Sequence, residues 1–269
     1  MPNVLCTPHL GASTEEAQTQ VAAEAATLLV DFLTTGAVRH AVNMVTIDPQ
    51  KLEGLRGFLD VGYRLGLLLA QLDRRPARSC RIQYRGEVAG KDTRLITAAI
   101  AAGLLAHALE EEINIVNAEL LLRERGIELV EQSRADMGAF SSLIQAELTT
   151  EGRTYRAAGT LFGHNMARLV QLDDYRLDAY LDGVLMIFTH RDVPGIIGRV
   201  GTLFGEHQVN IAQMAVGRAA RGGEAIGVLN LDTRPPEAAL QAVLSHPDIH
   251  SATVIELPEA GALPPWLGT

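Results

Sequence analysis

The sequence predicts an α+β protein built from more than one domain. Three observations lead to this prediction: a length of 269 residues with 47% hydrophobic content, a first segment whose apolar residues recur at helical spacing, and a last segment that alternates strands and helices as βαββαβ. Single cores stop growing at about 250 to 300 residues, so domains of roughly 75 to 150 residues are expected.

Composition excludes several classes of partner. The 23 basic and 32 acidic residues give a net charge of −9, which would repel a phosphate backbone and argues against nucleic acid. No apolar stretch reaches the ~20 residues that cross a bilayer, and no signal peptide is readable, so we expect a cytoplasmic protein without membrane contact. Cys6 and Cys80 are isolated, which predicts free thiols and no metal site.

The first segment, residues 1–40, predicts a strand end at 3–5, a loop, and one amphipathic helix over 14–35. Ser13 followed by Glu16 fits a capping box at the start of this helix. Gly36 fits the left-handed residue that ends it.

The middle segment, residues 41–182, predicts one α+β domain. The expected helices cover 49–72, 93–109 and 113–125, and the expected strands, read as antiparallel after the helices, cover 81–88, 127–130, 140–148, 154–161 and 169–172. A basic cluster within it, which we interpret by default as a solvated face, consists of Arg74, Arg75, Arg78, Arg81, Arg85, Lys91 and Arg94.

The last folded segment, residues 183–257, predicts a ferredoxin-like domain with two helices on one face of a small sheet. Strands are expected at 184–188, from 209, at 225–231 and at 253–257, with helices starting near Pro194 and Pro235. The tail, 258–269, holds three prolines and two glycines and is expected to be flexible.

No dinucleotide-binding fingerprint is present. Among the 25 glycines, no two are separated by a single residue, so the G-x-G-x-x-G turn that cradles a pyrophosphate cannot occur. We therefore expect this chain to bind no cofactor.

His9 lies in the predicted loop ahead of the first helix. Such a histidine is either an exposed structural residue or a general acid, because an imidazole with a pKa near ~6.5 exchanges protons at neutral pH. The runs Asn3–Leu5 and Thr7–Thr14 resemble the last catalytic segment of the D-isomer 2-hydroxyacid dehydrogenase family, in its D-3-phosphoglycerate dehydrogenase branch. The segments that follow resemble the intervening allosteric substrate-binding domain and the ACT domain of the long form.

This resemblance implies a function for the whole chain. His9 would exchange the proton of the substrate's C2 oxygen while NAD takes the hydride, and the dinucleotide-binding domain would precede residue 1. The chain would be the regulatory C-terminal portion of an enzyme that oxidises 3-phosphoglycerate for L-serine biosynthesis, truncated and inactive alone. The alternative is a stand-alone amino-acid-sensing or oligomerisation module that acts on a partner protein.

Two segments of the last domain suggest an effector site. Asp192 precedes Pro194-Gly195, and Asn210 lies at the start of the second predicted strand. Asp192 can accept from an ammonium, Asn210 can donate and accept, and N–H groups near Gly195 favour a carboxylate; alternatively, Asp192 only caps a helix. The pattern resembles the ACT effector motif, which implies L-serine or another small amino acid as ligand, His190 as a side wall, and homo-oligomers that pair sheet edges.

Arg168 carries the remaining expectation. It lies in the segment Met166–Gln171. Arg168 in this segment resembles a basic residue of an anion site in the same family. The resemblance implies that a phosphorylated substrate binds there, within the middle domain.

Overall fold

The computed structural model describes residues 3–4, 6–35, 40, 52–108, 113–136 and 138–267. The chain divides into two compact units, residues 1–52 and 53–268. The arrangement confirms the predicted α+β class. None of the helices in the described ranges is both long and apolar enough to cross a membrane.

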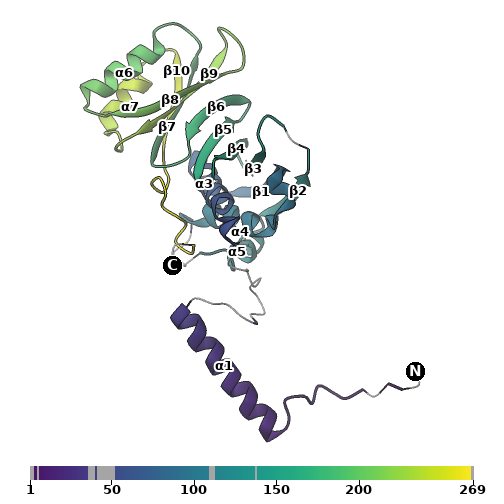
Figure 1. Ribbon diagram of the computed structural model, residues 1–269. Helices are drawn as coiled ribbons and strands as arrows, with labels where there is room; N and C mark the ends of the chain where they lie inside the picture. Colours follow the sequence, from purple (N-terminus) through teal and green to yellow (C-terminus); the bar gives the residue numbers. More distant parts are fainter. Residues whose placement is uncertain are drawn as a thin grey trace. The chain divides into compact units, whose positions relative to one another are not determined.

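The described residues of the first unit include a loop and the helix α1, Glu15–Thr35 (Figure 1). Thr14, not the expected Ser13, caps this helix, because the Thr14 hydroxyl accepts a hydrogen bond from the amide of Ala17 (3.2 Å). Asn3 and Val4 form no strand in the part of the chain that the structure describes. Gly36 lies outside the described residues.

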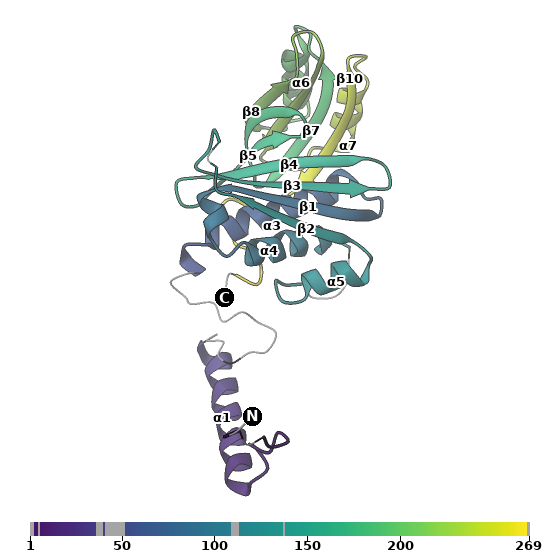
Figure 2. The ribbon, with the colours of Figure 1, turned by 90° about the vertical axis from the view of Figure 1, so that its right-hand side faces the viewer.

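The first part of the second unit is the six-stranded domain, from α3 to β6. Its sheet has the order β2-β1-β3-β4-β5-β6, and Figure 2 shows α3 and α4 on one face of it. The helical elements are α3 (Arg56–Leu72), η1 (Glu87–Gly90), α4 (Thr93–Leu105) and α5 (Ala118–Glu124). The strands are β1 (Ala77–Gly86), β2 (Glu128–Arg134), β3 (Ser142–Thr150), β4 (Thr154–Phe162), β5 (Met166–Leu172) and β6 (Tyr175–Tyr180).

Helices α3 and α4 pack unusually close because glycines face each other at their crossing. A Cβ on Gly66 would lie 2.3 Å from the Ile100 carbonyl oxygen, and one on Gly103 would lie 2.1 Å from that of Tyr63. Both distances are far below van der Waals contact, so larger side chains would force the helices apart. The buried surfaces of these helices form the core beneath the sheet.

Two predicted features of this domain were wrong, and one strand was missed. β2 pairs with β1 in parallel, because the chain between them crosses over through α4 and α5. The helix expected over 113–125 starts only at Ala118, since the Asn114 side chain accepts from the amide of Val116 (2.9 Å) and forms a turn instead. Strand β6 had not been predicted.

The second part of the second unit is the four-stranded domain, from β7 to β10, with its helices on one side of the sheet (Figure 1). Its antiparallel sheet has the order β10-β7-β9-β8. The elements are β7 (Val184–Arg191), α6 (Ile196–Glu206), β8 (Ile211–Arg218), β9 (Glu224–Leu231), α7 (Glu237–Leu244) and β10 (Ile249–Glu256). Phe188, Val200, Phe204 and Leu229 are fully buried in its core.

Arg64 of α3 connects the two domains of the second unit. It donates hydrogen bonds to Asp60 (2.7 Å) and to the carbonyl of Leu181 (3.1 Å), where the chain enters the four-stranded domain. It also donates to three carbonyls of the tail, those of Pro258 (2.5 Å), Glu259 (3.0 Å) and Ala262 (2.7 Å).

The described part of the tail, through Leu267, makes further contacts with the six-stranded domain; its expected flexibility stays a prediction. Trp266 meets the ring of Tyr63 edge to face, with centroids 6.1 Å apart, and Leu267 is buried. The prolines fix the backbone of this segment, and Arg64 binds the carbonyls that secondary structure would otherwise use.

Candidate functional site

His9 lies on the surface of the first unit. Its side chain is exposed, and its φ of 44° is in the left-handed region that few non-glycine residues adopt. Its amide donates to the carbonyl of Thr7 (3.0 Å). Within its own unit, no carboxylate of residues 3–4 or 6–35 contacts its ring.

Asp192 lies in the loop between β7 and α6, against the hairpin turn that joins β8 to β9. Its Oδ2 accepts from the amide of Gly222 (3.0 Å) and from Nη1 of Arg218 (3.3 Å), and its own amide donates to the Gly223 carbonyl (2.8 Å). The Gly222 N–H, followed by Arg218, holds the pKa of the Asp192 carboxyl below its usual value. Asp192 is thus an ionised, partly exposed acceptor.

The alternative interpretation of Asp192 as a helix cap finds no support. The N-cap of α6 is Gly195, with φ of 96°, a conformation that favours glycine. Among the described residues, no side chain accepts from the first amides of α6. These N–H groups remain able to bind an anion.

His190 is enclosed in the domain core rather than forming an open wall. It is 2% exposed and stacks on Phe188 with centroids 5.2 Å apart. Its Nδ1 lies 2.8 Å from the Arg191 carbonyl oxygen, so Nδ1 carries the proton. Its Nε2 is buried and has no hydrogen-bond partner within the described residues.

Asn210 lies just before β8 and does not meet Asp192. Its Nδ2 donates to Oδ2 of Asp232 (2.7 Å). Strands β7 and β8 are both antiparallel to β9, so they run in the same direction. Asp192 follows the end of β7, whereas Asn210 precedes the start of β8.

The two predicted effector residues therefore lie at opposite ends of one sheet. Arg191, the residue before Asp192, pairs with the first residue of β9, Glu224, and Ile211, the residue after Asn210, pairs with its last, Leu231. Over eight residues, at about 3.3 Å per residue, this separation is roughly 23 Å. One small amino acid cannot contact both within a single chain.

The sheet edge expected to pair between copies is partly engaged within the chain. The side-chain amide of Gln213 in β8 donates to the Asp178 carbonyl (2.9 Å) and accepts from the Tyr180 amide (3.0 Å), both in β6. Pairing of β8 with another copy would require β6 to release these contacts. Homo-oligomer formation through this edge stays a prediction.

Arg168 is a buried cation with unsatisfied donors. Its side chain is 12% exposed and its Nε lies 3.6 Å from Oδ1 of Asp178, beyond hydrogen-bonding distance. Its guanidinium lies over the rings of Tyr180 (4.1 Å) and Phe162 (5.3 Å). Nε and Nη1 are buried and have no hydrogen-bond partner in the described parts of the chain. Because unsatisfied buried donors are costly, the site suits an anion.

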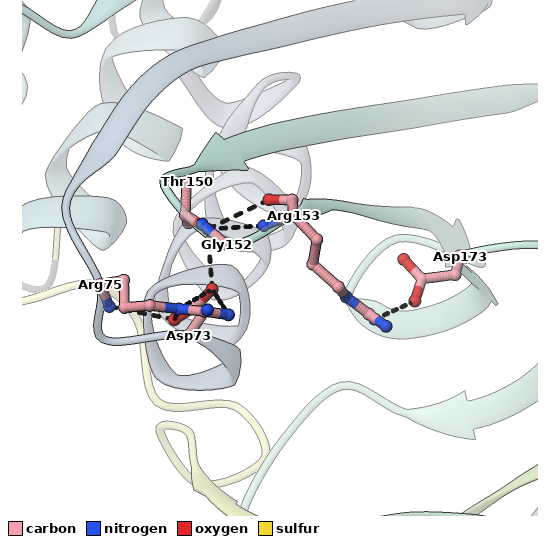
Figure 3. A network of polar contacts seen from close by, with 6 residues as sticks. All are labelled: Asp73, Arg75, Thr150, Gly152, Arg153 and Asp173. Atoms are coloured by element: carbon pink, nitrogen blue, oxygen red, sulfur yellow. Dashed lines mark hydrogen bonds and ion pairs between the residues drawn. The ribbon is translucent and has the colours of Figure 1, made fainter.

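The basic cluster of the middle segment is largely neutralised by ion pairs. Figure 3 shows the best-connected example, in which Asp73 accepts from Arg75 (2.8 Å) and from the Thr150 hydroxyl (2.7 Å). The Arg75 hydrogen bond is the main reason that the pKa of Asp73 lies well below its usual range. Four further arginines of the cluster pair with nearby acids, namely Arg78, Arg81, Arg85 and Arg94. These contacts agree with a solvated face rather than a phosphate site.

Both cysteines are free, and only Cys6 is exposed. Burial raises the pKa of the Cys80 thiol to about 12, so it is not a nucleophile. Within the described ranges, no group of three or more His, Cys, Asp or Glu side chains could hold a metal ion.

Arg218 is the site residue that sequence reasoning missed. It ends β8, and its neighbour in the turn, Arg221, looks equivalent in the sequence. The register of β8 with β9 pairs Arg218 with Ala225. Only this register shows which of the two arginines reaches Asp192.

Comparisons with known proteins identify both domains. Residues 54–173 match the D-3-phosphoglycerate dehydrogenase intervening domain, and residues 184–248 match the ACT domain. The chain is 33% identical to D-3-phosphoglycerate dehydrogenase of Bacillus subtilis, with 96% of the chain and 49% of the relative aligned. It is 36% identical to that of a Synechocystis species (95% and 46%) and 35% identical to that of Archaeoglobus fulgidus (96% and 49%). The chain spans about half the length of these relatives.

Proposed function

We propose that this chain, which carries the intervening and ACT domains of D-3-phosphoglycerate dehydrogenases, is the regulatory C-terminal portion of such an enzyme. The whole enzyme would oxidise 3-phosphoglycerate with NAD, and the ACT domain would sense L-serine. The observation that carries the proposal is the co-occurrence of both domains in one chain that aligns over almost its full length with these enzymes.

The effector site is proposed to need two copies of the chain. Asp192 offers a charged acceptor at one end of the sheet, and Asn210 offers a mixed donor and acceptor at the other. A two-fold arrangement in which the same sheet edge of two copies pairs antiparallel would place opposite ends of the sheet side by side. Asn210 of a second copy would then complete the site around Asp192. Because the effector would contact both copies, its binding would favour their association.

The Arg168 site is proposed to bind the phosphate of a phosphorylated substrate. This proposal is supported by two guanidinium nitrogens, Nε and Nη1, that have no hydrogen-bond partner within the described residues, and by the rings of Phe162 and Tyr180 that lie against the guanidinium. His9 is proposed to act in proton transfer only when a dinucleotide-binding domain is present, since no carboxylate contacts it in the described residues. The isolated chain should give no NADH with 3-phosphoglycerate.

A chimera tests this function directly. The first half of the Bacillus subtilis relative, which this chain does not cover, would be fused ahead of residue 1. We expect NAD-dependent oxidation of 3-phosphoglycerate that L-serine lowers, and loss of the serine effect in Asp192→Ala. An active chimera that ignores L-serine would contradict the regulatory role and favour the alternative, a module acting on another protein.

A further inference from the structure

The β8–β9 turn holds Arg218 and Asp192 in a fixed relation. The amide of Gly222 and Nη1 of Arg218 both donate to Oδ2 of Asp192, and the Asp192 amide donates back to the Gly223 carbonyl. Gly222 has φ of 72°, a conformation that costs glycine little. The turn is therefore tied to the β7–α6 loop by three contacts.

Each member of this pair keeps unused hydrogen-bonding groups. Within the described ranges, Oδ1 of Asp192 accepts no hydrogen bond, and Nε and Nη2 of Arg218 donate none. The Arg218 side chain is 51% exposed and that of Asp192 is 22% exposed. A ligand from solvent can thus reach a free carboxylate oxygen and a free guanidinium edge at the same place.

The pair is complementary to a zwitterion. An α-amino acid carries an ammonium and a carboxylate on one carbon, so its two charges are as close together as those of the pair. A carboxylate accepts strongly from an ammonium, and a guanidinium binds a carboxylate through two parallel N–H donors. Such a ligand would extend the existing ion pair into a ring of four alternating charges.

We propose that Arg218 is a further effector-binding residue, which binds the α-carboxylate of the amino acid while Asp192 binds the α-ammonium. This inference rests on the proposed function, because it takes the effector to be an amino acid. It makes Arg218 the main carboxylate partner, in place of the amides near Gly195. Asp192 and Arg218 of the same chain would then together select zwitterions over simple amines or acids.

Titration calorimetry of the full chain with L-serine and with ethanolamine tests the assignment. Ethanolamine keeps the ammonium and hydroxyl but lacks the carboxylate. Arg218→Gln should weaken L-serine binding about tenfold, the effect of one charge-assisted contact, and leave the weaker ethanolamine binding unchanged. Arg218→Lys should fall between, since it keeps the charge without the two-pronged geometry.

Arg221→Gln is the matched control, because Arg221 is exposed in the same turn and makes no ion pair among the described residues. It should bind L-serine like the parent. If the parent binds L-serine and Arg218→Gln binds it equally well, the assignment of Arg218 is overturned while the proposed function stands. Tighter binding by Arg218→Gln also overturns it, since Arg218 would then compete with the ammonium. A parent that binds no amino acid overturns both.

Discussion

Two buried arginines near the junction of the intervening and ACT domains differ in what surrounds them. The Arg64 side chain is 1% exposed and donates to Asp60 and to four backbone carbonyls. The Arg168 side chain is 12% exposed, yet two of its nitrogens are buried without a hydrogen-bond partner in the described residues. A buried cation whose donors are satisfied belongs to the scaffold. One with unsatisfied donors leaves hydrogen-bonding capacity for a further partner, which we propose to be an anion.

The largest expected effect is the loss of Arg64. Arg64→Met would leave the carboxyl of Asp60 buried without its charged partner and would release the carbonyls of the tail. Breaking a buried ion pair in this way costs about 3 to 5 kcal/mol. Urea unfolding followed by circular dichroism should show this loss in the free energy of unfolding.

Arg78→Met provides the comparison, because Arg78 forms an exposed ion pair with Glu151 (3.7 Å). Exposed pairs contribute about 0 to 1 kcal/mol, so the two variants should differ several-fold in stability loss. A loss below about 1 kcal/mol for Arg64→Met would show that the hydrogen bonds of Arg64 to Leu181 and to the tail do not stabilise the fold.

The second prediction is that loss of Arg168, unlike loss of Arg64, does not lower the stability of the unliganded protein. Arg168→Met removes a largely buried cation whose ion pair with Asp178 is long (3.6 Å) and keeps apolar contact with the rings of Phe162 and Tyr180, so the unliganded protein should be about as stable as the parent. Inorganic phosphate and 3-phosphoglycerate should raise the thermal midpoint of the parent and lose this effect in the variant. If Arg168→Met keeps the full phosphate shift, the anion site lies elsewhere.

The third prediction tests whether the effector site needs two copies. Asp192→Ala and Asn210→Ala should each lose the L-serine shift in thermal midpoint, and refolding the two variants together should restore part of it. A mixed dimer has one intact site, with Asp192 from one copy and Asn210 from the other. Refolding Asp192→Ala with the double variant should restore nothing. Mixed dimers without recovery would place the site within one chain.

The smallest expected effect is a pH dependence at Asp73. Its pKa is lowered in the folded state, chiefly by Arg75. Below about pH 4, the unfolded chain binds the proton while the folded chain does not, so stability falls as the pH drops. Asp73→Asn should show a shallower fall of unfolding free energy between pH 5 and pH 3. An identical slope would show that the network in Figure 3 adds no pH-dependent stability.

The sequence predicted most elements because their hydrophobic periodicity is strong, as in α4 and β9. It failed where a local polar contact or a long-range pairing decides the structure. The Asn114 turn delays α5, and the crossover makes β2 parallel.

For the candidate site, the sequence identified residue types but not their arrangement. Asp192 and Asn210 were expected to share a ligand, yet the strand order separates them by the length of β9. Arg218 could not be chosen over Arg221, since only the β8–β9 register brings one of them to Asp192. Spacing along the chain does not show which ends of a sheet are adjacent.

Thermal scans of this chain with L-serine show whether it senses an amino acid through Asp192. At about 100 times its dissociation constant, a ligand adds roughly 2.7 kcal/mol, which shifts the melting of a small domain by several degrees. We predict such a shift with L-serine for the parent and none for Asp192→Ala, whose unliganded midpoint should change little. The account is contradicted if L-serine, glycine and alanine all leave the parent unchanged, or if L-serine shifts the parent and Asp192→Ala equally.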